Sequence, residues 1–428
     1  MINKELAKAI VHKLGSYGTP PEFGLEYYTV GLEKYLEVIE EEYFKDYLKL
    51  RLSSFKLIVG NYGGGKTHFL YCLRKRAMEN SYLTSYVSLS PVECPFDKLE
   101  LVYKVIALNL MAPKISEDIS FDTFYYERGI DNIIKLWYQK IKEQISKKED
   151  FYSYLEGLSG VESISYLNAL RGSFEALVRE DYESFENLIQ YLKGEEITKD
   201  IRGRYRISER LDKSTAFRFI RSLAQWGHLI GYNGLILFFD EAERGLSISS
   251  SRDKRRALDN LRQIIDECGN ARLPGVMFFY AVTDENLILE GSGGVYEALK
   301  QRLRSTFTAT NPTGVKINLE VIEKKPPEFL YELGIRLARL FEIAYDISFN
   351  EKILKTTIDV LSEACLTTFA LDISFRRLFV LGIIEAFFRL KERNFKSALT
   401  VKEAEEILKT SLKRIEEEKE GEIESEEF

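Results

Sequence analysis

Residues 60–67 read Gly60-Asn61-Tyr62-Gly63-Gly64-Gly65-Lys66-Thr67, and this motif sets the fold expected for the rest of the chain. It matches G-x-x-x-x-G-K-[ST], a loop whose backbone N–H groups surround the phosphates of a nucleotide. The apolar run 55–59 before it is typical of a buried strand, and residues 68–74 after it keep helical spacing. The motif therefore lies between a strand and a helix, where the helix N-terminus adds its positive dipole end to a phosphate site.

Each part of this loop has its own expected role. The glycines allow the tight turns that point successive N–H groups inward at the phosphates. We expect Lys66 to reach the β- and γ-phosphate oxygens and Thr67 to ligate Mg²⁺. The sequence thus predicts a site for a nucleotide with Mg²⁺.

A second signature lies at Leu235–Phe239, an apolar run that is followed directly by Asp240 and Glu241. A continuous apolar run is typical of a parallel strand that is covered on both faces. We expect Asp240 to hold the water shell of the Mg²⁺ ion and Glu241 to polarise the attacking water as a general base. Together with the glycine-rich loop, this acid pair predicts nucleotide hydrolysis.

Three further apolar segments complete a predicted parallel sheet of five strands: 84–90, 275–282 and 315–320. Thr283 and Asp284 follow the second of them. Because ligands of open α/β sheets bind at the carboxyl ends of the strands, these two residues are expected at the same edge as Asp240. The fold class is therefore α/β, of the P-loop NTPase type.

The rest of the chain is predominantly helical by its spacing. An amphipathic stripe over 130–145 predicts core helices within a long helical insertion at about 112–213. Helices are also predicted at 2–14, at 32–50 and in four segments between 328 and 418. We expect N-terminal helices and an adenine-side loop (1–51), a nucleotide-binding core (52–320), a helical lid (321–418) and an acidic tail whose composition predicts disorder (419–428).

Composition limits the function classes. The chain has 428 residues, a net charge of −7 and four cysteines without a C-x-x-C pair. The acidic balance argues against coating of nucleic acid through overall charge, and the cysteines suggest neither a zinc site nor a disulfide framework. The N-terminus is unlike a signal peptide, and no uncharged apolar run approaches the length of a membrane span. We therefore expect a cytoplasmic protein with no membrane partner.

Two basic segments are candidates for contact with DNA. One consists of Arg252, Lys254, Arg255 and Arg256. The other is the run 202–210, for which a solvated loop is the favoured interpretation. Binding through either should weaken steeply with salt, because neutralised phosphates release their counterions.

The order of these parts resembles an AAA+ ATPase. A closer resemblance is to the ATP-binding proteins of BREX-type phage-defence systems, which have a similar P-loop and a Gly-Tyr-x-Gly-Leu run into the Asp-Glu strand. In this chain the two segments are Gly60 to His68 and Gly231 to Glu241. The resemblance spans roughly residues 18–380, although the stretch 112–213 matches only as a long helical insertion. It implies an ATPase with a C-terminal helical lid that assembles with other copies or partners on DNA.

Some site residues follow from this resemblance alone. Val30 and Gly31 belong to a segment similar to the Val-Gly-Arg-Glu box that lines the adenine, with Leu32 where arginine is usual. Thr283 and Asp284 stand where the first sensor has a polar residue that contacts the γ-phosphate and the lytic water.

Four arginines also gain candidate roles from the resemblance. Residues 301–307 are similar to a stretch of origin-recognition-type initiator ATPases in which an arginine projects into the neighbouring subunit's site. Arg302 is the preferred arginine finger and Arg304 the reserve. A lid segment resembles the second sensor, for which Arg376 is preferred and Arg377 is the alternative.

Two functional hypotheses remain. The first is an oligomeric AAA+ ATPase that acts on or with DNA in phage defence and loads or drives a partner helicase, nuclease or methyltransferase. The alternative is a nucleotide-switched adaptor that binds ATP, hydrolyses it slowly and recruits protein partners through the helical insertion. Glu241 and Arg302 favour the enzyme, whereas the acidic balance and the lack of a recognisable DNA-binding module favour the adaptor. A small-molecule kinase is disfavoured, because no acceptor pocket is evident.

Overall fold

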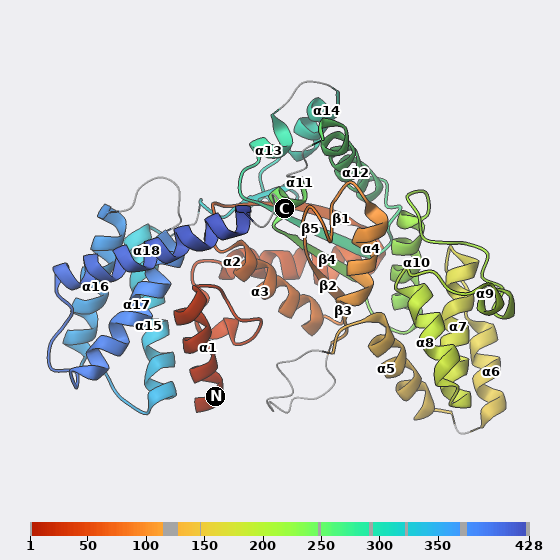
Figure 1. The fold of residues 1–428 in the computed structure, drawn as a ribbon, viewed down its shortest axis with the longest axis horizontal. Coiled ribbons are helices and arrows are strands. Elements are labelled where there is room, and N and C mark those ends of the chain that lie inside the picture. Colours follow the sequence, from red (N-terminus) through yellow and green to blue (C-terminus); the bar gives the residue numbers. More distant parts are fainter. Residues whose placement is uncertain are drawn as a thin grey trace.

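The structure, a computed structural model, describes residues 2–113, 127–145, 147–246, 250–290, 294–321, 324–368 and 375–424. A central sheet carries helices on both faces (Figure 1). The insertion helices lie at the right of the sheet in that view, and the C-terminal helices lie at the left beside the first helix of the chain. None of the described helices is long and apolar enough to cross a membrane.

The sheet has six strands in the order β3-β2-β4-β5-β1-β6. Their bounds are β1 Ser54–Val59, β2 Leu83–Ser88, β3 Leu110–Met111, β4 Leu235–Asp240, β5 Val276–Val282 and β6 Lys316–Asn318. Every pairing is parallel except that of β2 with β3. The five expected strands are thus present, but the prediction of a purely parallel five-stranded sheet is wrong. The sequence gives no sign of β3 because two residues are too short to display an alternating pattern.

Seven helical segments precede the insertion among the described residues. The predicted helix over 32–50 forms three consecutive pieces of different winding, namely α2, the π-helix η2 and the 3₁₀-helix η3. The bounds in this region are α1 Lys4–Tyr17, η1 Leu25–Tyr27, α2 Glu33–Ile39, η2 Glu40–Asp46, η3 Tyr47–Leu50, α3 Lys66–Glu79 and α4 Leu99–Leu108.

The expected insertion contains five helices among its described residues, and a sixth leads from it back to β4. They are α5 Ile130–Lys142, α6 Lys148–Gly157, α7 Ile164–Arg179, α8 Tyr182–Leu192, α9 Lys199–Arg204 and α10 Ala216–Leu229. The apolar stripe of α5 is buried, as its spacing predicts. Trp137 of this stripe packs with Phe174 at 4.6 Å and with Trp226 at 5.8 Å between ring centroids.

The remaining helices follow β4 and form the C-terminal region. They are α11 Ala242–Leu246, α12 Ser251–Gly269, α13 Asn286–Leu289, α14 Gly294–Leu303, α15 Pro326–Tyr345, α16 Glu351–Thr368, α17 Phe375–Glu392 and α18 Val401–Glu424. The last helix therefore continues beyond its expected end at Glu418 into the expected acidic tail. Residues 425–428 of that tail lie outside the described residues.

Two hydrophobic cores lie on opposite faces of the sheet. Alternate residues of β1 and β5 enter different cores, as Leu57 and Phe278 do on one face and Ile58 and Phe279 on the other. The first core continues into the insertion, and the second continues into α1, α3 and the C-terminal helices. Because both faces are covered, β5 is apolar throughout, and β4 is apolar up to Asp240 at its carboxyl end.

Candidate nucleotide site

A pocket of about 630 Å³ opens beside the glycine-rich loop. One end is polar and is formed by that loop, by the start of α3 and by the acids that follow β4. The other end is largely apolar and is formed by the N-terminal segment and the lid helices. The lining residues include Tyr62, Gly63, Gly65, Lys66, Thr67, His68, Asp240, Glu241 and Glu243 at the polar end, and Tyr28, Val30, Leu32, Phe329, Leu333 and Val380 at the apolar end.

The loop between β1 and α3 has the backbone that its glycines predict. Gly63 and Gly65 have φ values of 75° and 89°, in the left-handed region that side chains disfavour. The helix α3 begins directly afterwards at Lys66. The Lys66 ammonium donates to the carbonyls of Gly60 at 2.9 Å and Asn61 at 3.4 Å, so it lies folded back across the loop.

The structure brings Thr67 and Asp240 together, as expected for two residues that share a metal ion. The Thr67 hydroxyl donates to Oδ2 of Asp240 at 2.6 Å. The Tyr86 hydroxyl donates to the same oxygen at 2.5 Å, and the Glu241 N–H donates to Oδ1 at 2.9 Å. Burial, and then the Asp240 charge, raise the pKa of Tyr86 well above its usual value, so this phenol stays a donor. Sequence reasoning missed Tyr86, whose role depends on the pairing of β2 with β4.

Glu241 lines the pocket, and one oxygen of its carboxylate is engaged. Oε2 accepts from the Ser88 hydroxyl at 2.6 Å and from Arg244 at 3.1 Å. The residue also has a φ of 53°, an unusual conformation for a side chain of this kind. The register of β2 with β4 sets Ser88 opposite Asp240, which explains its reach to the next residue.

A third acid, Glu243, was not among the predicted site residues. It lines the pocket, and its carboxylate accepts from the Thr283 N–H at 3.2 Å. Burial raises the pKa of Glu243, and the nearby charge of Lys66 opposes that shift. Its position two residues after Glu241 was the one signal that could have identified it.

The predicted first sensor is only partly assembled. Thr283 contacts Glu243 through its backbone, whereas Asp284 is exposed and accepts from the Asn286 N–H at 2.9 Å. Neither side chain lines the pocket. Asp284 therefore serves the start of α13 in this structure.

The predicted adenine-side residues do reach the apolar end. Val30 and Leu32 are buried and line the pocket, and Gly31 between them has a φ of 76°. Leu32, in the position where arginine is usual, contributes an apolar wall. The ring of His68 packs against Tyr28 with 5.0 Å between the centroids.

Both arginines considered for the second sensor contact the glycine-rich loop. Arg376 is 8% exposed and donates to the carbonyls of Gly64 and of Leu319, the latter at 2.7 Å. Burial lowers the pKa of Arg376. Its neighbour Arg377 donates to the Tyr62 hydroxyl at 2.9 Å.

Arg377 also joins distant parts of the chain at the pocket. It donates to the carbonyl of Tyr17 at 2.8 Å, at the end of α1, and to the carboxylate of Glu418 on α18. The C-terminal helix thereby reaches the pocket, which sequence reasoning did not foresee.

The two candidate arginine fingers differ in their surroundings. Arg302 forms a two-point ion pair with Asp266, at 2.5 and 3.1 Å, and donates to the carbonyl of Ala298 at 2.9 Å. Arg304 is exposed and forms no ion pair with any of the described residues. Neither lines the pocket of its own chain.

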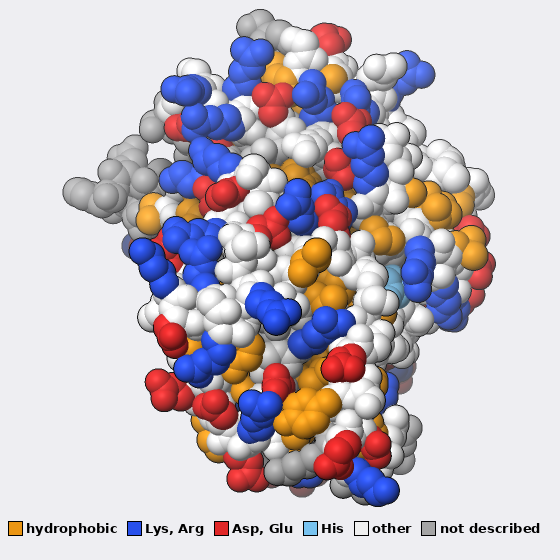
Figure 2. All heavy atoms as spheres, turned by 90° about the vertical axis from the view of Figure 1, so that its right-hand side faces the viewer, with side chains coloured by type: hydrophobic (Ala, Val, Ile, Leu, Met, Phe, Trp, Pro, Cys, Tyr) orange, Lys and Arg blue, Asp and Glu red, His pale blue; other side chains and the backbone are white. Residues whose placement is uncertain are grey.

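The basic segment of α12 is largely open to solvent. Arg252 and Arg255 are exposed and Lys254 is half-buried, whereas Arg256 pairs with Asp253 at 2.7 Å. Figure 2 views the molecule from the side of the insertion. Lys and Arg side chains are dense over the upper half of this face, and acidic ones are frequent near its lower end.

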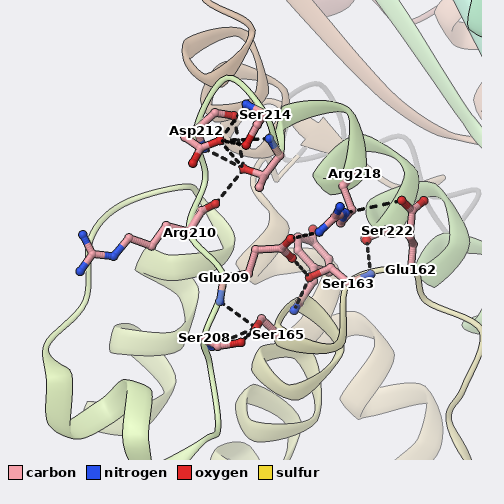
Figure 3. A network of polar contacts seen from close by, with 12 residues as sticks. Glu162, Ser163, Ser165, Ser208, Glu209, Arg210, Asp212, Ser214, Arg218 and Ser222 are labelled. Atoms are coloured by element: carbon pink, nitrogen blue, oxygen red, sulfur yellow. Dashed lines mark hydrogen bonds and ion pairs between the residues drawn. The ribbon is translucent and has the colours of Figure 1, made fainter.

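Residues of the run 202–210 form ion pairs and hydrogen bonds with other residues of the same chain. Arg204 pairs with Asp200 and Arg210 with Glu196. The Ser165 hydroxyl accepts from the N–H groups of Ser208 and Glu209, both at 3.0 Å (Figure 3). The Glu209 carboxylate in turn accepts from Ser163 and Arg218 (Figure 3). These contacts favour the interpretation of this run as a structural loop.

The mostly parallel sheet and its helices are consistent with a fold of the P-loop NTPase class, with the glycine-rich loop between β1 and α3 and the acid pair after β4. The family model for BREX system ATP-binding protein BrxC/D matches residues 2–399. The chain therefore belongs to this family, and the membership indicates ATP binding in a phage-defence system. No curated protein and no solved structure gives a significant match.

Proposed function

We propose that the protein binds Mg²⁺–ATP in this pocket and hydrolyses it as an AAA+ ATPase that works as an oligomer, on or with DNA. The observation that carries the proposal is the convergence of Lys66, Thr67, Asp240 and Glu241 on one pocket. In the primary sequence the first two are separated from the last two by more than 170 residues. Their meeting at the carboxyl edge of the sheet supports a common chemical task.

The phosphates would lie over the glycine-rich loop. The N–H groups at the start of α3 and the Lys66 ammonium would neutralise the phosphate charge, once that ammonium leaves the carbonyls of Gly60 and Asn61. The Thr67 hydroxyl and the Asp240 carboxylate are the hard oxygen donors that Mg²⁺ prefers. The ion would supply charge neutralisation at the β- and γ-phosphates.

Glu241 would orient and deprotonate the attacking water. Oε2 of this carboxylate is held by Ser88 and Arg244, and we propose that this arrangement is a resting site. Glu243 stays with Thr283 and would keep the end of β5 next to the acid pair.

Hydrolysis would then depend on assembly. An arginine from a neighbouring copy would stabilise the transition state, and such a finger supplies about 10³- to 10⁵-fold in rate in other phosphoryl-transfer proteins. Arg304 is already free of ion pairs with described residues, whereas Arg302 must exchange Asp266 for the phosphate. Arg376 would act by holding the loop at Gly64, and Arg377 by contact with the nucleotide.

The adaptor remains the second candidate, because one copy of the chain holds both Glu241 and Arg302 in internal contacts. Such a protein would bind ATP tightly and hydrolyse it slowly. DNA contact through Arg252, Lys254 and Arg255, and recruitment of a helicase, nuclease or methyltransferase, are further parts of the first proposal.

The deciding experiment is steady-state ATP hydrolysis across protein concentration, with and without single- and double-stranded DNA. Wild type is compared with Arg302→Ala and Arg304→Ala. Turnover that rises with concentration or DNA and collapses in one arginine variant supports the assembling ATPase. Tight ATP binding with flat, negligible turnover in every sample would refute it in favour of the adaptor.

A further inference from the structure

His68 occupies the junction between the polar and apolar ends of the pocket. It follows Thr67 in the first turn of α3, and its ring lines the pocket against Tyr28. A nucleotide whose phosphates lie on the glycine-rich loop would place its base toward the apolar walls at Val30 and Phe329. His68 is therefore next to the expected position of the base.

The contacts of Thr29 fix which nitrogen of this imidazole carries the hydrogen. The Thr29 hydroxyl oxygen lies 2.7 Å from the carbonyl oxygen of Leu25 and 2.8 Å from Nε2 of His68. A carbonyl has no hydrogen to give, so the single hydroxyl hydrogen of Thr29 must lie in the contact with Leu25. The contact with His68 then needs its hydrogen from the ring, which makes Nε2 the N–H and Nδ1 the bare acceptor.

The acceptor nitrogen has no hydrogen-bond partner among the described residues. Among the described residues, the polar contacts of the ring are those of Nε2 with Thr29 and Cys72. Nδ1 has no hydrogen-bond partner there, and it is not one of the buried polar atoms that lack a partner. The ring itself lines the pocket.

We propose that His68 selects adenine by accepting a hydrogen bond at Nδ1 from the exocyclic amino group of the base, and that Thr29 holds the ring in the required tautomer. A base with a carbonyl in place of that amino group would set one lone pair against another, and its approach would leave both groups unpaired. The inference rests on the proposed binding of ATP in this pocket, but not on hydrolysis, oligomerisation or DNA.

The test compares ATP with inosine triphosphate, which differs from ATP only in the carbonyl and ring N–H that replace the amino edge of adenine. Binding is measured by calorimetry at pH 8, where an imidazole is neutral without any shift of its pKa. Wild type should prefer ATP by about tenfold or more. His68→Phe, which keeps a ring against Tyr28 but has no acceptor, should bring the ratio close to one.

A matched pair of variants tests the role of Thr29. Thr29→Ser keeps the hydroxyl and should keep the preference for ATP. Thr29→Val removes the partner of Nε2–H, so the ring is free to present Nδ1–H to the pocket, and the ratio should fall or turn toward inosine triphosphate. A general loss of packing would instead weaken the binding of both nucleotides equally. Thermal melting of each variant without nucleotide shows whether the variant is folded.

Four outcomes would overturn the inference. They are a wild type without preference, a His68→Phe protein with an unchanged ratio, a Thr29→Val protein that behaves like Thr29→Ser, and a His68→Phe protein that loses discrimination between ATP and 2′-deoxy-ATP. The last would place the histidine contact on the ribose. Failure of wild type to bind either nucleotide would refute the proposed function itself, which separates that result from the others.

Discussion

Replacement of Tyr86 by phenylalanine should lower the apparent affinity for Mg²⁺ and leave the protein folded. Oδ2 of Asp240 accepts from Thr67 at 2.6 Å and from Tyr86 at 2.5 Å. When the Thr67 hydroxyl turns to a bound ion, Tyr86 is the remaining side-chain donor to that oxygen among the described residues. Asp240 is only 2% exposed, so water has little access to replace the lost phenol.

The expected size of the effect follows from these contacts. A hydrogen bond to a charged group contributes about 1.5–3 kcal/mol, and loss of an outer-shell partner typically lowers metal affinity 10- to 100-fold. The N–H of Glu241 still holds Oδ1 in the variant, so we expect the lower end, a loss of about tenfold in apparent Mg²⁺ affinity. The affinity for ATP without Mg²⁺ should be unchanged, because the phenol contacts no predicted phosphate ligand.

The assay is fluorescent ATP-analogue binding titrated with Mg²⁺, with a parallel series in chelator. Tyr103→Phe is the matched control, since it also removes a buried hydroxyl, one that contacts Tyr166 at 2.9 Å and the Leu192 carbonyl at 2.8 Å in the insertion core. Its Mg²⁺ dependence should equal that of wild type. An unchanged Mg²⁺ requirement in folded Tyr86→Phe, or an equal loss in the control, would refute the reasoning.

Three further outcomes are expected. Glu241→Gln should retain ATP binding and lose turnover at least 100-fold, which single-turnover kinetics would measure, and a wild-type rate would rule out its role as base. Burial lowers the pKa of Lys56, which is 1% exposed, to about 7. The unfolded chain then holds more protons than the native state between pH 7 and 10, so the free energy of unfolding should rise with pH in urea titrations, and less so in Lys56→Met. Charge reversal at Arg252, Lys254 and Arg255 should weaken DNA binding and make it less dependent on salt concentration. Unaltered binding would exclude these three residues as DNA contacts.

Local sequence patterns were sufficient to predict that the glycine-rich loop and the acid pair form part of one candidate site. The glycine-rich loop and the acid pair each lie within a few consecutive residues, and the apolar runs beside them identify strands that are covered on both faces. Strand β3 escaped prediction because its two residues pair with β2 only through the fold. Sequence patterns likewise cannot predict the contacts of a residue when these depend on which strands are neighbours in the sheet.

Contacts between distant elements could not be read from the sequence. Ser88 and Tyr86 reach the acid pair because β2 lies beside β4, and neither residue carries a motif of its own. The resemblance that made Arg302 a candidate finger says nothing of Asp266, which lies on another helix. Arg376 was the preferred second sensor, and in the structure it is buried and donates to the carbonyl of Gly64.

Three charged groups of the proposed mechanism are held by internal contacts in a single copy of the chain. Glu241 is engaged by Ser88 and Arg244, Arg302 by Asp266, and Arg377 by Glu418. In the proposed mechanism, each of these contacts would be exchanged for a contact with water, phosphate or nucleotide. A ligand shifts such an equilibrium only by its differential affinity for the two states. Nucleotide and a neighbouring copy would together supply that difference, which is why assembly and turnover should be coupled in this protein.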